Sequence, residues 1–272
     1  MNIDEISKEV FMSKLITASS LLLGSIIIII FNFLIPGNID VFTKNITEVN
    51  IMTENFGSNS DLVQYYLAII ALGLVIFIYG ILGFYKNVSN RENNIKYFFV
   101  VMNISAVILF LSVISVGTAF AGAAQLNMQA YGMAQAATQV SAQVSQSGDQ
   151  AAMFEAAQRE SVATINSIIA GSSSASLYTL FWGLLSVAGY VFYIATASIG
   201  ALIIRSGNHY LSKLMNNIIG FGFIISGTLF LILNIIWKVN TEWGYRIFST
   251  SQIVWFILIV ILSINLLRST KK

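Results

Sequence analysis

The sequence predicts an all-α integral membrane protein: six transmembrane helices, with a helical hairpin outside the cytoplasm between helices three and four. The first observation is composition, because 56% of the 272 residues are hydrophobic and only 10% are charged, whereas soluble proteins carry about 25% charged residues. The second is a set of six long apolar stretches, and the third is a polar segment between two of them that is rich in alanine, glutamine and serine. A soluble single domain is therefore excluded.

Each apolar stretch is long enough to cross a bilayer. A hydrocarbon core about 30 Å thick requires about 20 apolar residues in a helix, and no charged residue lies inside any of the stretches. The six predicted spans are Leu15–Pro36, Leu62–Tyr85, Tyr97–Phe120, Leu177–Ile204, Leu214–Trp237 and Ser249–Leu267.

The distribution of basic residues predicts the orientation of the spans. With six spans, the two termini and the loops after the second and fourth spans share one side, which holds ten of the fourteen Lys and Arg residues. Because basic residues accumulate in the cytoplasm, we expect a cell-membrane protein with both termini cytoplasmic and with the acidic loop 37–61 outside. These basic residues lie in short loops beside the spans, where their partners are anionic membrane lipids and not nucleic acid.

Residues 121–176 differ in composition from the flanking regions, 1–120 and 177–272, which carry three spans each. Alanine and glutamine favour helix, and no proline or charged turn separates the third span from the first arm of this segment. We therefore expect one continuous helix there, with a coiled-coil seam at alternating spacings of four and three. The residues of that seam are Leu126, Ala130, Met133, Ala137, Val140 and Val144.

A second arm is predicted after a short turn. Gly148 suits a helix stop, and Ser147 with Gln150 resembles a capping box for the next helix. The four residues 171–174, Gly-Ser-Ser-Ser, are expected to end this arm before the fourth span. The residues of its predicted seam are Phe154, Ala157, Ser161, Thr164 or Ile165, and Ile168.

The two predicted arms form a hairpin that faces the outside. Alanine buries little apolar area, so a hairpin of this composition is marginally stable alone. It is expected to pack against other membrane protein subunits or a second copy of itself; the alternative is a solvated extension that covers the outer loops. The candidate partner-binding residues are Leu126, Met133, Val140, Val144, Phe154, Ile165 and Ile168.

The chain lacks the residues on which most catalytic and metal sites depend. It contains no cysteine and one histidine, which excludes disulfides, thiolate chemistry and zinc sites built on cysteine or several histidines. No ionisable residue lies within a span, which argues against proton-coupled transport and intramembrane proteolysis. We therefore expect no enzymatic activity, no cofactor and no metal.

Neutral polar residues do occur inside the spans. Asn103, Tyr190, Tyr193 and Asn234 are the candidates for an intramembrane polar site. They could line a path for a small neutral solute, or they could form hydrogen bonds between helices, which contribute about 0.6 kcal/mol per pair. The second interpretation is favoured.

Small residues recur in the fourth and fifth spans, notably Ala197 and Ala201, and Gly220, Gly222 and Gly227. Such residues allow membrane helices to pack closely.

Because catalytic and redox groups are missing, the leading hypothesis is a non-enzymatic multi-pass protein. It would be a scaffold, assembly or accessory subunit of a membrane complex that acts through its outer hairpin. The alternative is a channel or transporter for a small neutral solute.

Overall fold

The computed structural model describes residues 14–87, 94–205 and 213–269, and every regular element within them is a helix. The two chain ends, for which a cytoplasmic location is predicted, lie outside the described residues. The elements are α2 (Lys14–Leu34), the 3-10 helix η1 (Asn38–Phe42), α3 (Val49–Ser58), α4 (Ser60–Asn87), α5 (Asn94–Ser145), α6 (Gln150–Arg205), α7 (Lys213–Ile236) and α8 (Glu242–Ser269).

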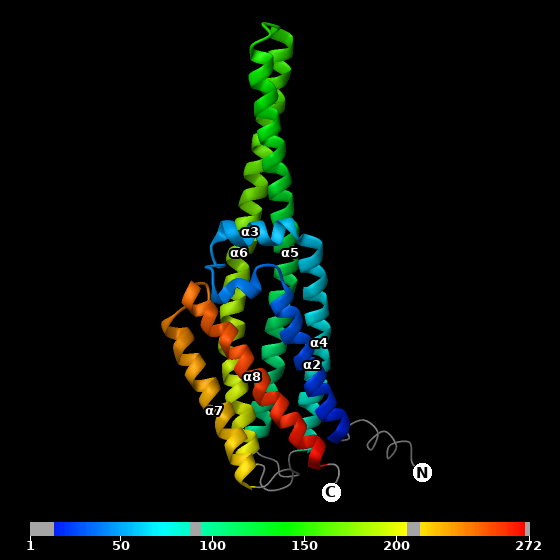
Figure 1. Cartoon of the computed structure of the whole chain (residues 1–272), viewed down its shortest axis with the longest axis vertical. Coiled ribbons are helices and arrows are strands. Elements are labelled where there is room, and N and C mark those ends of the chain that lie inside the picture. The colour runs from blue at the N-terminus through cyan, green and yellow to red at the C-terminus, as the bar shows by residue number, and fades with distance from the viewer. Residues whose placement is uncertain (1–13, 88–93, 206–212, 270–272) are drawn as a thin grey trace, which may run out of the picture.

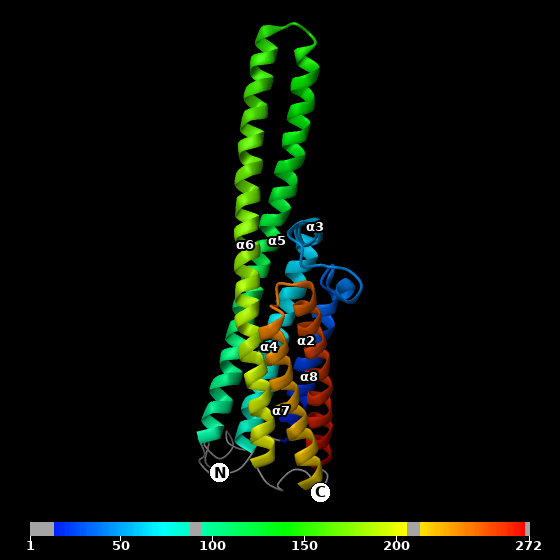
Figure 2. The ribbon, with the colours of Figure 1, turned by 90° about the vertical axis from the view of Figure 1, so that its left-hand side faces the viewer.

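Six of these helices, α2 and α4 to α8, are long and apolar enough to cross a membrane. Each of the six predicted spans falls on one of them, and no span ends more than two residues beyond its helix. This is the architecture of a multi-pass membrane protein. α5 and α6 are much longer than their spans, and they extend together well beyond the other helices (Figures 1 and 2).

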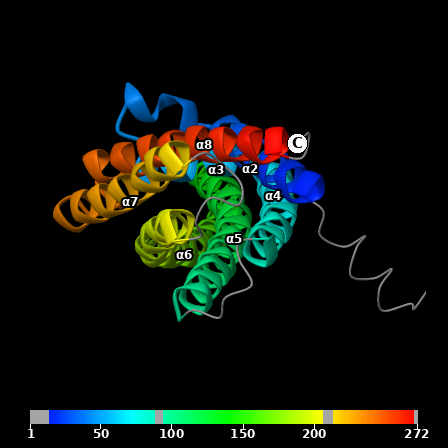
Figure 3. The ribbon, with the colours of Figure 1, turned by 90° about the horizontal axis from the view of Figure 1, so that it is seen from below.

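The six long helices form two layers of three, which are visible in the view from below (Figure 3). One layer contains α7, α8 and α2, and the other contains α6, α5 and α4. The layers join at their two edges, where α2 contacts α4 and α6 contacts α7. In the part of the chain that the structure describes, the middle helices α5 and α8 make no extensive backbone contact. The two layers are therefore separated at their centre.

Glycines allow the backbones to approach closely at both edges. A Cβ atom on Gly24 of α2 would lie 2.6 Å from the backbone nitrogen of Phe77 on α4. A Cβ atom on Gly227 of α7 would lie 2.5 Å from the carbonyl oxygen of Tyr193 on α6, and one on Gly220 would lie 2.5 Å from a side-chain carbon of Ile204. Any larger residue at these positions would push the two layers apart. The predicted close packing of the fifth span is thus confirmed at Gly220 and Gly227.

Two apolar clusters fill the interior of the helix bundle. One lies toward the end from which α5 and α6 project, the distal end, and includes Val41, Phe56 and Phe120. The other lies toward the opposite end, the base, and includes Leu21 and Leu266. Residues of both clusters line a central cavity.

The loop between α2 and α4 folds over the distal end of the bundle. No helix was predicted in this loop, but it contains η1 and α3. A Cβ atom on Gly57 of α3 would lie 2.9 Å from the backbone of Ala124 on α5, so this glycine lets α3 lie directly on α5. The hydroxyl of Tyr178 on α6 donates a hydrogen bond to the carbonyl oxygen of Thr47, which holds the loop against α6 as well.

α5 and α6 are joined by a short turn at their far end. α5 ends at Ser145, and Gly148 lies in the turn that follows, where its φ of +72° is in the left-handed region that favours glycine. The predicted capping box is wrong: Asp149 caps α6 instead, because its Oδ1 accepts hydrogen bonds from the backbone nitrogens of Ala151 at 3.0 Å and Ala152 at 3.2 Å. A carboxylate is favoured at this position by the helix dipole.

α5 is continuous from its predicted span into its first arm, as expected, but the second arm differs from the prediction. α6 does not end at residues 171–174 and runs unbroken from Gln150 to Arg205. A glycine inside a helix costs about 1 kcal/mol, whereas a break would leave several backbone groups without partners at each new end. Ser174 is buried here at 2% exposure, so packing also favours the continuous helix.

We predict that Gly227→Ala and Gly24→Ala destabilise the bundle, because each new methyl group overlaps backbone atoms of the facing helix. The expected loss in free energy of unfolding is about 1–3 kcal/mol, measured by thermal or denaturant unfolding of the purified protein in detergent. Gly122→Ala is the matched control, because nothing lies within 4 Å of its Cβ position. It should raise stability by about 0.5–1 kcal/mol. Equal effects at Gly122 and Gly227 would contradict the close packing.

Candidate functional site

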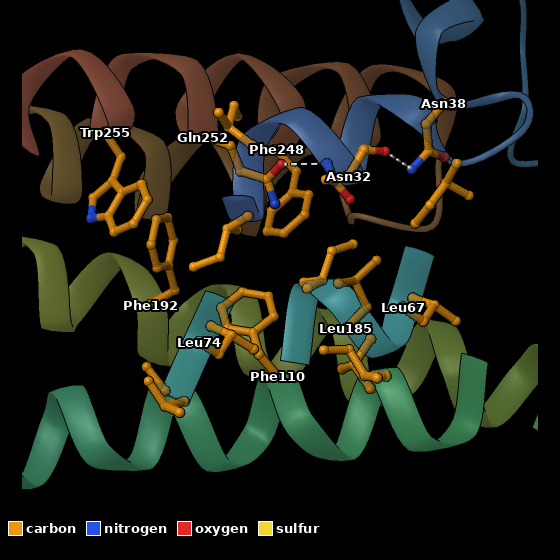
Figure 4. Close-up of a pocket in the computed structure, with 18 of the residues that line it drawn as sticks. Asn32, Asn38, Leu67, Leu74, Phe110, Leu185, Phe192, Phe248, Gln252 and Trp255 are labelled. Carbon is orange, nitrogen blue, oxygen red and sulfur yellow. Dashed lines mark hydrogen bonds between the residues drawn. The ribbon is translucent and has the colours of Figure 1, made fainter. Parts of the chain in front are cut away.

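The central cavity has a volume of about 120 Å³. It lies between the two layers, where α5 and α8 are separated, and five long helices line it together with η1 and α3 (Figure 4). Helix α7 contributes no lining residue. Met52 and Phe56 of α3 lie at its distal end, and Phe77 of α4 and Trp255 of α8 lie toward the base.

Aromatic rings form much of the cavity wall. Phe192 of α6 packs against Phe110 of α5 at 5.8 Å between ring centroids and against Trp255 of α8 at 5.5 Å. Phe110 also lies 6.4 Å from Phe248 of α8. These rings connect the middle helices of the two layers through edge-to-face and tilted contacts, which are favourable geometries for aromatic pairs. They therefore keep the layers at a fixed separation.

One pair of amides stands out on this apolar wall. The side-chain nitrogen of Asn32 on α2 donates a hydrogen bond of 2.9 Å to Oε1 of Gln252 on α8. Asn38 of η1 donates to the backbone carbonyl of Asn32 at 2.9 Å and accepts a hydrogen bond from the hydroxyl of Tyr245 at 3.2 Å. The amide pair thus joins two neighbouring helices of one layer and is held in place from the distal end.

No charged side chain lines the cavity. In the described residues, no group of three or more His, Cys, Asp or Glu side chains is placed to hold a metal ion. The arrangement can therefore accommodate neutral groups through van der Waals contact and hydrogen bonding. A bare ion in this cavity would lose its hydration without gaining an opposite charge.

Three of the four predicted intramembrane polar residues come together, but away from the cavity. Asn234 of α7 donates a hydrogen bond of 2.8 Å to the hydroxyl of Tyr193 on α6, and Ser251 of α8 donates to the same oxygen at 3.2 Å. The Tyr190 hydroxyl donates to the backbone carbonyl of Asn234 at 3.3 Å. This cluster links α6, α7 and α8, as the favoured interpretation of interhelical hydrogen bonds expects.

The fourth predicted residue, Asn103, lies on the cavity wall. Its side-chain nitrogen donates to the backbone carbonyl of Phe99 at 2.8 Å and to Oγ of Ser198 on α6 at 3.3 Å. Gln252 was missed by the sequence reasoning. A lone glutamine in an apolar span is the signal that could have identified it, but its pairing with Asn32 depends on α2 and α8 being neighbours.

The second candidate surface is formed by the distal arms, defined here as residues 126–145 of α5 and 150–170 of α6. Half of the predicted first seam is correct: Ala130, Ala137 and Val144 are partly buried. The other half is wrong by one residue, because Leu126, Met133 and Val140 are exposed. Small side chains allow the close contact of the arms, as expected. The partly buried residues of α5 are Asn127, Ala130, Ala134, Ala137, Ser141 and Val144.

The predicted seam of the second arm is wrong throughout, because Ala157, Ser161 and Thr164 are exposed as well as its large apolar residues. The less exposed positions of this arm are mostly alanine or serine, including Ala156, Ala163 and Ser167, whereas the predicted seam residues Phe154, Ile165 and Ile168 are exposed. Leu126, Met133, Phe154 and Ile168 are each more than 60% exposed. The candidate partner-binding residues, with the exception of the partly buried Val144, thus point away from the contact between the arms. Their role in binding a partner stays a prediction.

No protein-family model, curated protein or solved structure matches this chain. The two candidate sites, the central cavity and the distal arms, are therefore defined by their own geometry.

We predict that Tyr193→Phe lowers the free energy of unfolding by about 1–3 kcal/mol, because the buried Asn234 amide loses the closer of its two acceptors. Thermal unfolding in detergent measures the change. Tyr190→Phe is the matched control and should cost less than about 0.5 kcal/mol, since its single hydrogen bond is long and the Asn234 carbonyl it reaches belongs to the backbone of α7. A loss at Tyr190 as large as that at Tyr193 would contradict the role of the cluster.

Proposed function

We propose that this protein is a scaffold, assembly or accessory subunit of a membrane complex, and that it binds its partners through the distal arms. The partners are other membrane protein subunits or further copies of the chain. The observation that carries the proposal is the outward direction of the large apolar side chains on a segment that projects beyond the bundle. The activity is non-enzymatic, and binding is its only chemistry.

The position of the arms supports this role. Met128 on α5 lies beside Gly57 of α3, and from there the first arm continues to Ser145, which at 1.5 Å per residue is about 25 Å beyond the cover of the bundle. The neighbouring helices end well below this level (Figure 1). The other described helices of the chain therefore do not cover the arms. Exposed apolar side chains in such a position mark interaction surfaces.

The small number of charged residues on the arms supports it further. Residues 97–148 contain no charged residue, and in the second arm the charged residues are confined to Glu155, Arg159 and Glu160 near the turn. A helix that remains in water usually carries charged residues on its solvent face. Here the outer faces are alanine, glutamine and isolated large apolar residues, so a partner can cover them without desolvating charges.

The proposed orientation places the distal arms outside the cell and the base in the cytoplasm. The charges of the described residues favour it, because those at the base are all basic, whereas the loop at the distal end includes Asp40, Glu48 and Glu54. Basic residues next to membrane helices remain on the cytoplasmic side. The described basic residues at the base are Lys14, Lys86, Lys96, Arg205 and Arg268.

We predict that a single cysteine at Ser147, in the turn between the arms, reacts with a membrane-impermeant maleimide in intact cells. A cysteine at Ser206, in the loop between the fourth and fifth spans, should react only after the cells are opened. The absence of native cysteine makes both signals specific. The reverse labelling pattern would invert the proposed orientation.

We predict that replacing the exposed apolar residues of the first arm abolishes complex formation without unfolding the bundle. In the triple variant Leu126→Gln, Met133→Gln and Val140→Gln, the affinity should fall at least tenfold, because each large apolar side chain contributes about 1–2 kcal/mol when a partner buries it. Co-purification after gentle solubilisation and the mass of the assembly in solution are the measurements.

The matched control for this experiment changes three exposed glutamines of the same arm, Gln135→Ala, Gln139→Ala and Gln143→Ala. It should leave the assembly intact, because those side chains do not supply apolar area. If the unmodified protein purifies alone as a monomer, or if both triple variants behave alike, the proposed role of the arms is wrong.

The central cavity favours a second candidate function, a channel or transporter for a small neutral solute. It lies between the layers, it has no charged lining residue, and it contains a few polar groups. Met52 and Phe56 line its distal end, and Phe77 and Trp255 of the basal apolar cluster line the other. A monomeric protein that admits a neutral solute into liposomes would support this function over the scaffold.

A further inference from the structure

We propose that the central cavity is a binding site for a small neutral alcohol, a molecule with one hydroxyl group on an apolar body of about five or six non-hydrogen atoms. This goes beyond the proposed assembly function, because the cavity is separate from the distal arms and can be tested independently of them. Binding is proposed here, without a requirement for transport.

The size of the cavity sets the size of the ligand. Its volume is about 120 Å³, and an apolar cavity of about 150 Å³ holds one benzene molecule, which has six non-hydrogen atoms. The walls are built from Phe110, Phe192, Phe248 and Trp255 with aliphatic neighbours (Figure 4). Water gains few hydrogen bonds against such walls, whereas an apolar body gains van der Waals contact on all sides.

The amide pair sets the polar group of the ligand. The hydrogen bond between Asn32 and Gln252 uses the nitrogen of the first and the oxygen of the second. The remaining groups, the Gln252 nitrogen and the Asn32 side-chain oxygen, have no hydrogen-bond partner among the described residues, and Figure 4 shows both turned toward the middle of the cavity. One donor and one acceptor therefore lie side by side. If the nitrogen and oxygen of both side-chain amides were interchanged, one donor and one acceptor would still face the cavity.

A hydroxyl group complements this combination better than other neutral groups. Its oxygen can accept a hydrogen bond from the Gln252 nitrogen while its proton is donated to the Asn32 oxygen. A carbonyl group can only accept, and it would leave the Asn32 oxygen without a donor. A carboxylate or an ammonium group would be buried without an opposite charge, because no charged side chain lines the cavity.

Quenching of tryptophan fluorescence tests this site with a matched pair of ligands, 3-bromo-1-propanol and 1-bromopropane. Both carry a bromine atom that quenches a neighbouring indole, and only the first has a hydroxyl group. In a variant that retains Trp255 alone, with Trp182→Phe, Trp237→Phe and Trp243→Phe, the alcohol should quench saturably. It should bind about fivefold more tightly than the bromoalkane, as expected for a net gain of one hydrogen bond.

Two variants locate the binding. Ala106→Phe places a ring into the cavity from α5 and should abolish saturable quenching by both ligands. Gln252→Leu should remove the preference for the alcohol while bromopropane still binds. Asn265→Leu is the matched control on the same helix: its exposed side-chain nitrogen donates to the backbone carbonyl of Ile261 and lies away from the cavity. It should leave the preference unchanged.

Linear quenching that is the same in the Ala106→Phe variant would show partition into detergent only and would overturn the proposal. A preference for the alcohol that survives Gln252→Leu would equally overturn the role of the amide pair. If the tryptophan variant does not fold, the melting temperature of the unmodified protein decides. Saturating alcohol should raise it, and neither Gln252→Leu nor Ala106→Phe should show the same rise.

Discussion

Close backbone contact at the two edges of the bundle is the constraint on which the rest of the structure depends. Glycines bring α2 against α4 and α6 against α7 so tightly that a single added methyl group would overlap backbone atoms. The edges are thereby fixed, while the middle helices α5 and α8 stay apart because aromatic rings stand between them. The cavity is a consequence of this difference: small residues draw the layers together at the edges, and large residues hold them apart at the centre.

The bundle and the distal arms differ in the direction of their side chains. In the bundle, polar side chains are turned inward and form hydrogen bonds between helices, as the cluster around Tyr193 and the amide pair of Asn32 and Gln252 demonstrate. On the arms, small residues occupy the contact between the helices, and large apolar residues are turned outward. Alanine allows two helices to lie close, but it buries too little area to stabilise a long projection by itself. The contact between the arms thus leaves their large apolar side chains exposed.

The helical class, the six long apolar helices and the continuity of α5 follow directly from sequence, because span length and the lack of charge depend on local composition. The register of the arms does not. Leu126 and Asn127 differ by one position, and a repeat of three and four residues fits either. The large apolar side chains led to the prediction of a seam through Leu126, but in the structure smaller side chains one position later occupy the contact between the arms. The pairing of Asn32 with Gln252, 220 residues apart, depends on which helices are neighbours, and that information is distributed over the whole chain.

The unbroken course of α5 has a mechanical consequence. Phe110 on the cavity wall and Ser145 at the tip belong to one rod, and the distance between them is about 50 Å at 1.5 Å per residue. A tilt of 5° about the level of Phe110 would therefore displace the tip by about 4 Å, which is the scale of a side chain. A small shift of the aromatic rings around the cavity would therefore produce a larger displacement at the tip of α5. α6 would move with α5, because the two helices are packed together.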